Sequence, residues 1–344
     1  MKNLSLILFL IVAIFSCTSK GKLDIDNPKL DTKLSISRFD KELFQADIYK
    51  LKELNEQWLN KYGILYESFI NQMINAGHPK DPMIGYRLEN FLTDSTILTI
   101  KNKLEEKFDD FSVYEKELNQ SFGYYHHYYP KTPIPFIVTF YSNFNAKSFP
   151  YKDTLGIGLD LFLGRDEELV SYLAPEKYPQ YLKQDMDPEY LVSETMKSWV
   201  YANHSRPQEY ANSTLYGVRE DFLSSLIYHG KMMLLLEATT PNKSIENRFS
   251  FTKKEIDWCK KNEQFIFQNL IEFELLYSKN LKEIKAYINP GSFTPGLPQD
   301  SPGGIGKWIG YKMVKNYFET KEISLQQLIE NQNDAREILK YYKP

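Results

Sequence analysis

The stretch FLSSLIYHGKMMLLLE, at residues 222–237, has the apolar spacing of a buried helix. Steps of three and four residues place His229 on one apolar stripe, which consists of Val218, Phe222, Leu226, His229, Met233 and Leu236. Lys231 is turned about 200° away from His229. Glu237 lies two turns beyond His229, roughly 12 Å along the axis, which is too far for both side chains to bind one metal ion directly. The sequence therefore predicts a long core helix over residues 213–237 that carries one unusual polar residue.

Helical patterns extend in both directions from this segment. Residues 39–129 show helical apolar spacing with polar interruptions, and helical patterns return after Gly164. Between them, residues 134–142 are β-branched and aromatic, and residues 154–164 alternate with glycines, which indicates two or three strands. We therefore predict an α+β fold, mainly α, in a single domain over residues 34–344 with a small antiparallel sheet.

Capping residues mark several helix starts in the sequence. Asp94 is a typical N-cap, and Asp187 followed by a proline opens the helix predicted over residues 187–204. Two capping boxes, in which a Ser or Thr is followed three residues later by Glu or Gln, are formed by Thr252 with Glu255 and Ser324 with Gln327.

A loop rich in proline and glycine occupies residues 289–304. Loops of about 16 residues in a compact domain tend to be functional or disordered. The Gly-Lys pair just after it does not make a phosphate-binding loop, because Trp308 follows Lys307 where a Ser or Thr is required. Gly306 and Gly310 predict instead a smooth helix face that another helix can approach closely.

Composition limits the possible functions. The chain has 344 residues, with 25% charged and 42% hydrophobic residues and a net charge of −3. A net negative charge gives no electrostatic argument for binding nucleic acid. Aromatic residues make up 15% of the chain, which is explained by an aromatic core or by a surface on which sugars stack.

The N-terminus is typical of a bacterial lipoprotein. Lys2 precedes an apolar run at residues 4–15, which is too short to span a bilayer and ends in a small residue followed by Cys17. This pattern resembles a lipobox and predicts a signal peptide at residues 1–16, a lipid on Cys17 that holds the chain on a membrane, and a polar tether at residues 17–33.

Few residues in the chain could hold a metal. None of the five histidines lies four residues from another, so the H-E-x-x-H pattern of zinc peptidases is absent from the sequence. With Cys17 consumed by the lipid, Cys259 has no disulfide partner and is expected to be a buried small hydrophobe. We therefore expect no metal or other cofactor.

Several motifs together resemble the family of gliding-motility lipoproteins called GldB. They are ISRFDKELF at residues 36–44, IGLDLFLG at 157–164, LIYHGKMM at 226–233, NPGSFTPGLPQDSPGGIGKWIGYKMVKNYF at 289–318 and the closing YKP. The resemblance implies a protein of the Bacteroidetes cell envelope that is required for gliding, and whose partners are other envelope proteins of the gliding and type IX secretion apparatus. No enzymatic activity is established for the family.

The family is similar in turn to predicted zinc metallopeptidases, which implies a metallopeptidase-like scaffold. In those proteins one helix carries H-E-x-x-H and a later helix supplies a glutamate. The matching positions here are residues 193–197, where only Glu194 is kept, and His229, which stands where the later glutamate is expected. The resemblance thus implies an inactive peptidase cleft. We expect this cleft to bind an extended protein segment, with Glu194 and His229 near an edge strand that contains Gly156 and Gly158.

Two alternatives remain open at this point. One is an active metallopeptidase that uses His229, Glu194 and Glu237 as ligands. The other is a glycan-binding lipoprotein, in which the aromatics around GYYHHYYP, at residues 123–130, would form an exposed stripe. Thr18, Ser19, Lys20 and Gly21 lack the acidic run of surface-exposed lipoproteins, so we expect the chain to face the periplasm.

Overall fold

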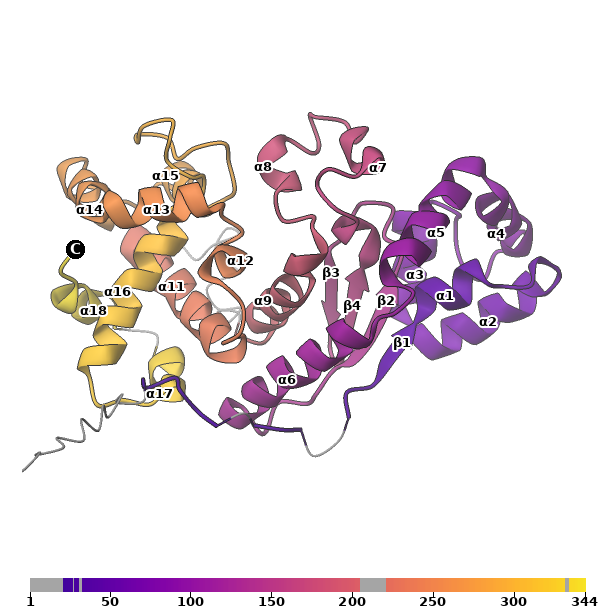
Figure 1. The fold of residues 1–344 in the computed structure, drawn as a ribbon, viewed down its shortest axis with the longest axis horizontal. Coiled ribbons are helices and arrows are strands. Elements are labelled where there is room, and N and C mark those ends of the chain that lie inside the picture. The colour runs from indigo at the N-terminus through magenta and orange to yellow at the C-terminus, as the bar shows by residue number, and fades with distance from the viewer. Residues whose placement is uncertain (1–20, 27, 31–32, 205–220, 332–333) are drawn as a thin grey trace, which may run out of the picture.

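The structure, a computed structural model, describes residues 21–26, 28–30, 33–204, 221–331 and 334–344. The chain is mainly helical and has one small sheet near its middle, with N-terminal helices at one end of the molecule and C-terminal helices at the other (Figure 1). The predicted α+β, mainly helical class is confirmed. The signal segment and Cys17 lie outside the described residues.

The helices form three groups along the chain. The first comprises α1 (Phe39–Phe44), α2 (Leu51–Tyr62), α3 (Ile64–Ser68), α4 (Ile84–Thr93), α5 (Ser95–Phe108) and α6 (Ser112–Tyr128). The second follows the sheet and comprises α7 (Glu168–Ser171), α8 (Gln180–Lys183) and α9 (Leu191–Asn203). The third comprises α11 (Phe222–Thr239), α12 (Ile245–Phe249), α13 (Lys253–Lys261), α14 (Glu263–Glu272), α15 (Leu281–Ile288), α16 (Gly306–Thr320), α17 (Leu325–Glu330) and α18 (Ala335–Tyr341). Short 3-10 or π segments lie at Ile48–Lys50, Phe69–Met73, Leu159–Phe162, Pro188–Tyr190 and Leu275–Tyr277.

The sheet is mixed, and the prediction of an antiparallel sheet is wrong. Its strands are β1 (Ile36–Arg38), β2 (Phe136–Phe140), β3 (Ser148–Tyr151) and β4 (Thr154–Gly158), in the spatial order β1-β2-β4-β3. β1 and β4 both pair with β2 in parallel, and only the β3–β4 hairpin is antiparallel. The prediction failed because it paired consecutive strands, whereas the chain crosses over after β2 and places β3 on the outside.

Helix α11 is the centre of the C-terminal half. It is apolar on nearly all sides, as expected of a helix surrounded by others. Gly230 of α11 faces Gly310 of α16, and a Cβ on Gly310 would lie 1.9 Å from the carbonyl oxygen of Leu226. The predicted smooth face of α16 is therefore confirmed. Lys231, on the side away from His229, is also buried and pairs with Asp334 at 2.8 Å.

Local sequence signals were reliable in this fold. Asp94 caps α5, and both predicted capping boxes, at Thr252 and Ser324, are formed. Cys259 is fully buried, as predicted, and burial raises the pKa of its thiol. None of the helices in the described part of the chain combines the length and apolarity needed to cross a bilayer.

Candidate functional site

A cleft of about 150 Å³ lies where four parts of the chain meet. These parts are α8 with the residues after it, the first turns of α9, the turn between α12 and α13, and the loop that leads into α16. We call it the charged cleft, because it is lined by the ionisable side chains of Asp185, Glu194, Lys197, Glu255 and Lys307. The long loop supplies Pro290, Gly291, Gly303 and Gly304 to its wall, so this loop does contribute to a cavity.

Ser250 is placed in the cleft by the end of α12. Its backbone adopts the left-handed conformation, with φ of 57°, and this turn ends the helix. Gln184 then holds the turn, because its side-chain amide donates to the carbonyl of Ser250 at 3.1 Å and to Glu255 at 3.1 Å. Glu255 also completes the capping box of α13 with Thr252, so the same carboxylate fixes the start of the next helix.

Two carboxylates that line the cleft, Glu194 and Asp185, are each held in an ion pair. Lys197 pairs with Glu194 one turn earlier on α9, and Lys147, in the segment before β3, pairs with Asp185. Ser250 joins the first pair, since its hydroxyl donates to Glu194 at 2.7 Å and accepts from the Lys197 ammonium at 3.0 Å.

The two carboxyl groups have opposite pKa shifts. Burial opposes ionisation of Glu194, but Lys197 and Lys147 lower the pKa of this carboxyl to about 2. Burial, together with repulsion from Glu194, raises the pKa of Asp185. Glu194 therefore carries a fixed negative charge in the cleft at neutral pH.

Lys307 is the lysine of the cleft that lacks a direct counter-charge. Among the residues that the structure describes, no hydrogen bond and no ion pair reaches its ammonium group. Burial, followed by repulsion from Lys197, lowers the pKa of Lys307 to about 8, although Glu194 and Asp185 act in the other direction. The first turn of α16 thus presents a partly buried cation that no described side chain pairs with.

The contact between Ser250 and Lys197 has the spacing of a nucleophile and its base in some hydrolases. Here the ammonium of Lys197 is held by Glu194, and an ammonium in an ion pair has no lone pair with which to accept the serine proton. The hydroxyl of Ser250 itself donates to Glu194 and is oriented by that bond. The geometry is therefore one of a fixed polar network.

Of the four residues predicted for a binding cleft, only Glu194 lines the charged cleft. His229 lies on α11, where its Nδ1 is 2.9 Å from the hydroxyl of Tyr201. Gly156 and Gly158 lie in β4. Among these four residues, therefore, Glu194 is the one placed at the charged cleft, and a joint binding site for all four stays a prediction.

β4 is not an edge strand, contrary to the expectation from its glycines. It pairs with β2 on one side and β3 on the other, so its main-chain groups are already used. Its glycines make room for the chain's own packing: a Cβ on Gly158 would lie 2.0 Å from the carbonyl oxygen of Ala146, and one on Gly156 would lie 2.8 Å from Leu65.

The three residues of the metallopeptidase alternative lie in separate networks. Glu194 contacts Lys197 and Ser250, whereas Glu237 accepts from Tyr311 and Lys315, each at 2.8 Å. His229 bonds to neither carboxylate in any contact that the structure gives. In the described ranges, no group of three or more His, Cys, Asp or Glu side chains is placed to hold a metal ion.

The aromatic segment GYYHHYYP does not form an exposed stripe. Tyr124, Tyr125 and Tyr128 are each at most 7% exposed and belong to the packed side of α6. The form of the glycan-binding alternative that relied on this segment is therefore wrong.

Sequence reasoning missed Lys147, Asp185, Ser250 and Lys307. These residues come from elements far apart in the chain, and no spacing rule connects them. The signal in the sequence that points to this site is the loop rich in glycine at residues 289–304, which is followed closely by Lys307 at a helix start.

The sequence profile of a protein family described as "Gliding motility protein GldB" matches residues 19–344. No curated protein and no solved structure matches the chain significantly.

Proposed function

Because the chain belongs to the GldB family of gliding motility proteins, we propose that it serves gliding as a non-catalytic binding protein of the cell envelope. In this proposal a lipid on Cys17 holds the chain on a membrane, on the periplasmic side, and the charged cleft binds a segment of another envelope protein of the gliding apparatus. The metallopeptidase-like scaffold stays a prediction, since no solved structure matches the chain.

The observation that carries this proposal is the unpaired ammonium of Lys307. A partly buried ammonium without a partner costs free energy, and natural proteins keep such costs mainly where function needs them. Lys197 and Lys147 already have Glu194 and Asp185, so one carboxylate from outside would supply the missing counter-charge. The ligand class that fits is therefore an acidic side chain or a C-terminal carboxylate of a partner protein.

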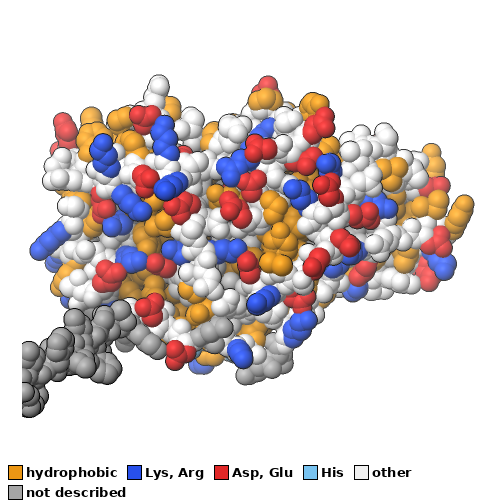
Figure 2. All heavy atoms as spheres, in the orientation of Figure 1, with side chains coloured by type: hydrophobic (Ala, Val, Ile, Leu, Met, Phe, Trp, Pro, Cys, Tyr) orange, Lys and Arg blue, Asp and Glu red, His pale blue; other side chains and the backbone are white. Residues whose placement is uncertain are grey.

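The surface gives no support to nucleic acid as the ligand. On the face shown in Figure 2, Lys and Arg side chains are interspersed with Asp and Glu and form no broad basic area. A nucleic-acid site needs several phosphate contacts along such an area. A single unpaired ammonium beside ion-paired lysines suits one carboxylate better.

Replacement of Lys307 in the chromosomal copy tests the proposal. We expect Lys307→Met to abolish gliding on agar without lowering the amount of protein in the membrane fraction. Lys312→Met is the matched control, because Lys312 lies on the same helix, outside the cleft, in a pair with Glu263 at 3.3 Å. Normal gliding of the Lys307→Met strain would refute a role for the cleft.

A photo-reactive amino acid at Tyr181, on the cleft rim, tests whether the ligand is a protein. We expect one cross-linked envelope protein in the Lys312→Met background and its loss in the Lys307→Met background. The absence of catalysis is tested separately with a fluorophosphonate, which modifies nucleophilic serines. Labelling of Ser250 together with peptide hydrolysis, or zinc bound in near-stoichiometric amount and lost on His229→Ala, would favour an enzyme.

A further inference from the structure

The segment before β1, predicted as a tether, lies against the body of the protein in its described part. Leu23, Ile25 and Leu30 are partly buried and pack on the core. In Figure 1 this segment runs from β1 along α6 and ends beside the C-terminal helices. We call residues 21–26 and 28–30 the strap.

The far end of the strap is bound to the last turn of α16. The ammonium of Lys22 donates to the carbonyl of Phe318 at 2.8 Å and to the carbonyl of Lys321, and it lies 5.3 Å from the centre of the Phe318 ring. The carbonyls at a helix C-terminus lack partners within the helix and carry a partial negative charge. Lys22 therefore caps α16 and holds this part of the strap against the C-terminal helices.

The middle of the strap is held by α6. A Cβ on Gly123 would lie 2.4 Å from the carbonyl oxygen of Pro28, so the strap backbone touches the helix where α6 has no side chain. Closer to β1, Asn119 of α6 accepts from the backbone N–H of Leu34 at 2.9 Å, and Lys33 pairs with Glu115 at 2.5 Å. The strap thus joins the sheet half to the C-terminal half at several points.

We propose that the strap fixes the lipid anchor to the C-terminal end of α16, so that the membrane lies at this end of the molecule and the charged cleft faces away from it. The proposal rests on the lipid at Cys17 that belongs to the proposed function. The partner surface at the α16–α17 end is a lipid bilayer.

The length of chain between lipid and body supports this orientation. Lys22 lies five positions after Cys17, and five Cα-to-Cα steps span at most roughly 18 Å in any conformation. Without the strap, the first fixed residue would be Leu34, and 17 residues reach roughly 60 Å. The strap therefore shortens the longest possible distance between the lipid and the first fixed residue about threefold. This keeps the end of the molecule at Lys22 next to the bilayer.

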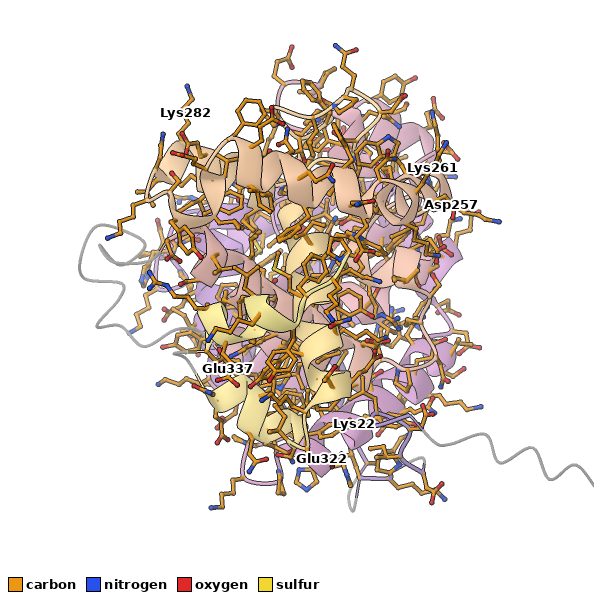
Figure 3. All side chains as sticks on the ribbon, turned by 90° about the vertical axis from the view of Figure 1, so that its left-hand side faces the viewer. Lys22, Asp257, Lys261, Lys282, Glu322 and Glu337 are labelled. Carbon is orange, nitrogen blue, oxygen red and sulfur yellow. The ribbon has the colours of Figure 1, made fainter. Side chains whose placement is uncertain are left out.

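Helix α16 connects the end of the molecule at Lys22 with the charged cleft. Its first turn carries Lys307, and its last turn binds Lys22, so about 20 Å of helix separates the two at 1.5 Å per residue. Figure 3 shows Lys22 and Glu322 together at one end of the molecule, with Asp257 and Lys261 of α13 toward the other end. The cleft residue Glu255 lies in the first turn of α13, so the cleft belongs to the end away from the anchor.

Energy transfer to the bilayer tests the orientation. The lipidated protein is reconstituted into phosphatidylcholine vesicles that contain an acceptor dye on a lipid, and a donor dye is attached at Glu322→Cys or at Lys261→Cys. The lipid occupies the thiol of Cys17 and Cys259 is 0% exposed, so the introduced cysteine is the reactive one. We expect transfer from position 322 to be at least twofold more efficient than from position 261.

A second pair of variants tests the strap itself. Lys22→Glu should reduce the difference between the two donor positions, whereas Lys29→Glu, which makes the same charge change at an exposed position of the strap, should preserve it. Equal transfer from both positions in protein that floats with the vesicles would refute the orientation alone. Protein that stays out of the floating vesicle fraction would refute the lipid anchor, and the orientation with it.

Discussion

The hydroxyl of Ser250 donates a hydrogen bond of 2.7 Å to the carboxylate of Glu194, and this bond joins the turn after α12 to the first turns of α9. It connects two segments that are more than fifty residues apart in the chain. The charged cleft exists because such bonds hold its walls, so the same residues affect both stability and binding.

Glu194→Gln should destabilise the protein at neutral pH. Lys197 and Lys147 lower the pKa of Glu194 to about 2 against the effect of burial. A carboxyl whose pKa is lower in the folded state stabilises the fold at pH values above its unfolded-state pKa. This stabilisation is lost as the pH falls from about 4.5 to about 2. We expect urea unfolding to show a loss of about 1–3 kcal/mol at pH 7 that shrinks toward zero near pH 2. Glu189→Gln, at an exposed site, is the control and should change little.

Lys307→Met should stabilise the protein at neutral pH while it removes function. Burial lowers the pKa of Lys307 to about 8, so the charged form is disfavoured in the folded state. This destabilisation is fully present below pH 8 and disappears as the pH rises toward the unfolded-state pKa near 10.5. The variant should therefore have a free energy of unfolding about 1–3 kcal/mol higher than the parent at pH 7, and an unchanged one above about pH 10.5. Denaturant unfolding at pH 7 and pH 10.5 measures both values. Lower stability of the variant at pH 7 would mean that the ammonium already has a partner.

Gly310→Ala should disrupt the contact between α16 and α11. The new Cβ would lie 1.9 Å from the carbonyl oxygen of Leu226, and a backbone atom cannot rotate away as a side chain can. We expect a loss of about 3 kcal/mol or more in the free energy of unfolding, which exceeds the helix-propensity gain of about 1 kcal/mol. Gly85→Ala in α4 is the control, since its Cβ would meet nothing closer than 3.6 Å, and it should be neutral or slightly stabilising.

Lys231→Met should be strongly destabilising because it leaves Asp334 as a buried, unpaired carboxylate. Both side chains are at most 5% exposed. Removal of one partner of a buried ion pair typically costs about 3–5 kcal/mol. Adding Asp334→Asn should recover much of that loss, and a double-mutant cycle on unfolding free energies measures the coupling. Additive effects of the two changes would contradict a direct interaction.

The sequence was sufficient for features that depend on neighbouring residues. The capping boxes at Thr252 and Ser324 and the smooth face at Gly310 each follow from a short pattern, and each is present. Family membership was also recognisable from motifs spread along the chain.

Features that depend on distant residues were not predictable. β1 has three residues and pairs in parallel with β2, which lies about a hundred residues later in the chain. No local sequence pattern predicts such a pairing. The glycines of β4 fit an exposed strand or a tightly packed one equally well. The charged cleft collects Asp185, Glu194, Ser250 and Lys307 from four parts of the chain, and the sequence predicts only Glu194 as a cleft residue.

The Lys22 contact also determines how the molecule bears load. If Cys17 carries the proposed lipid, a pull on it would reach Lys22 before any strand of the sheet and would act on α16, whose Gly310 packs directly against α11. Force from a moving envelope would therefore act first on the closely packed pair of α11 and α16. Strand β1 would carry no force until the strap had detached from the body.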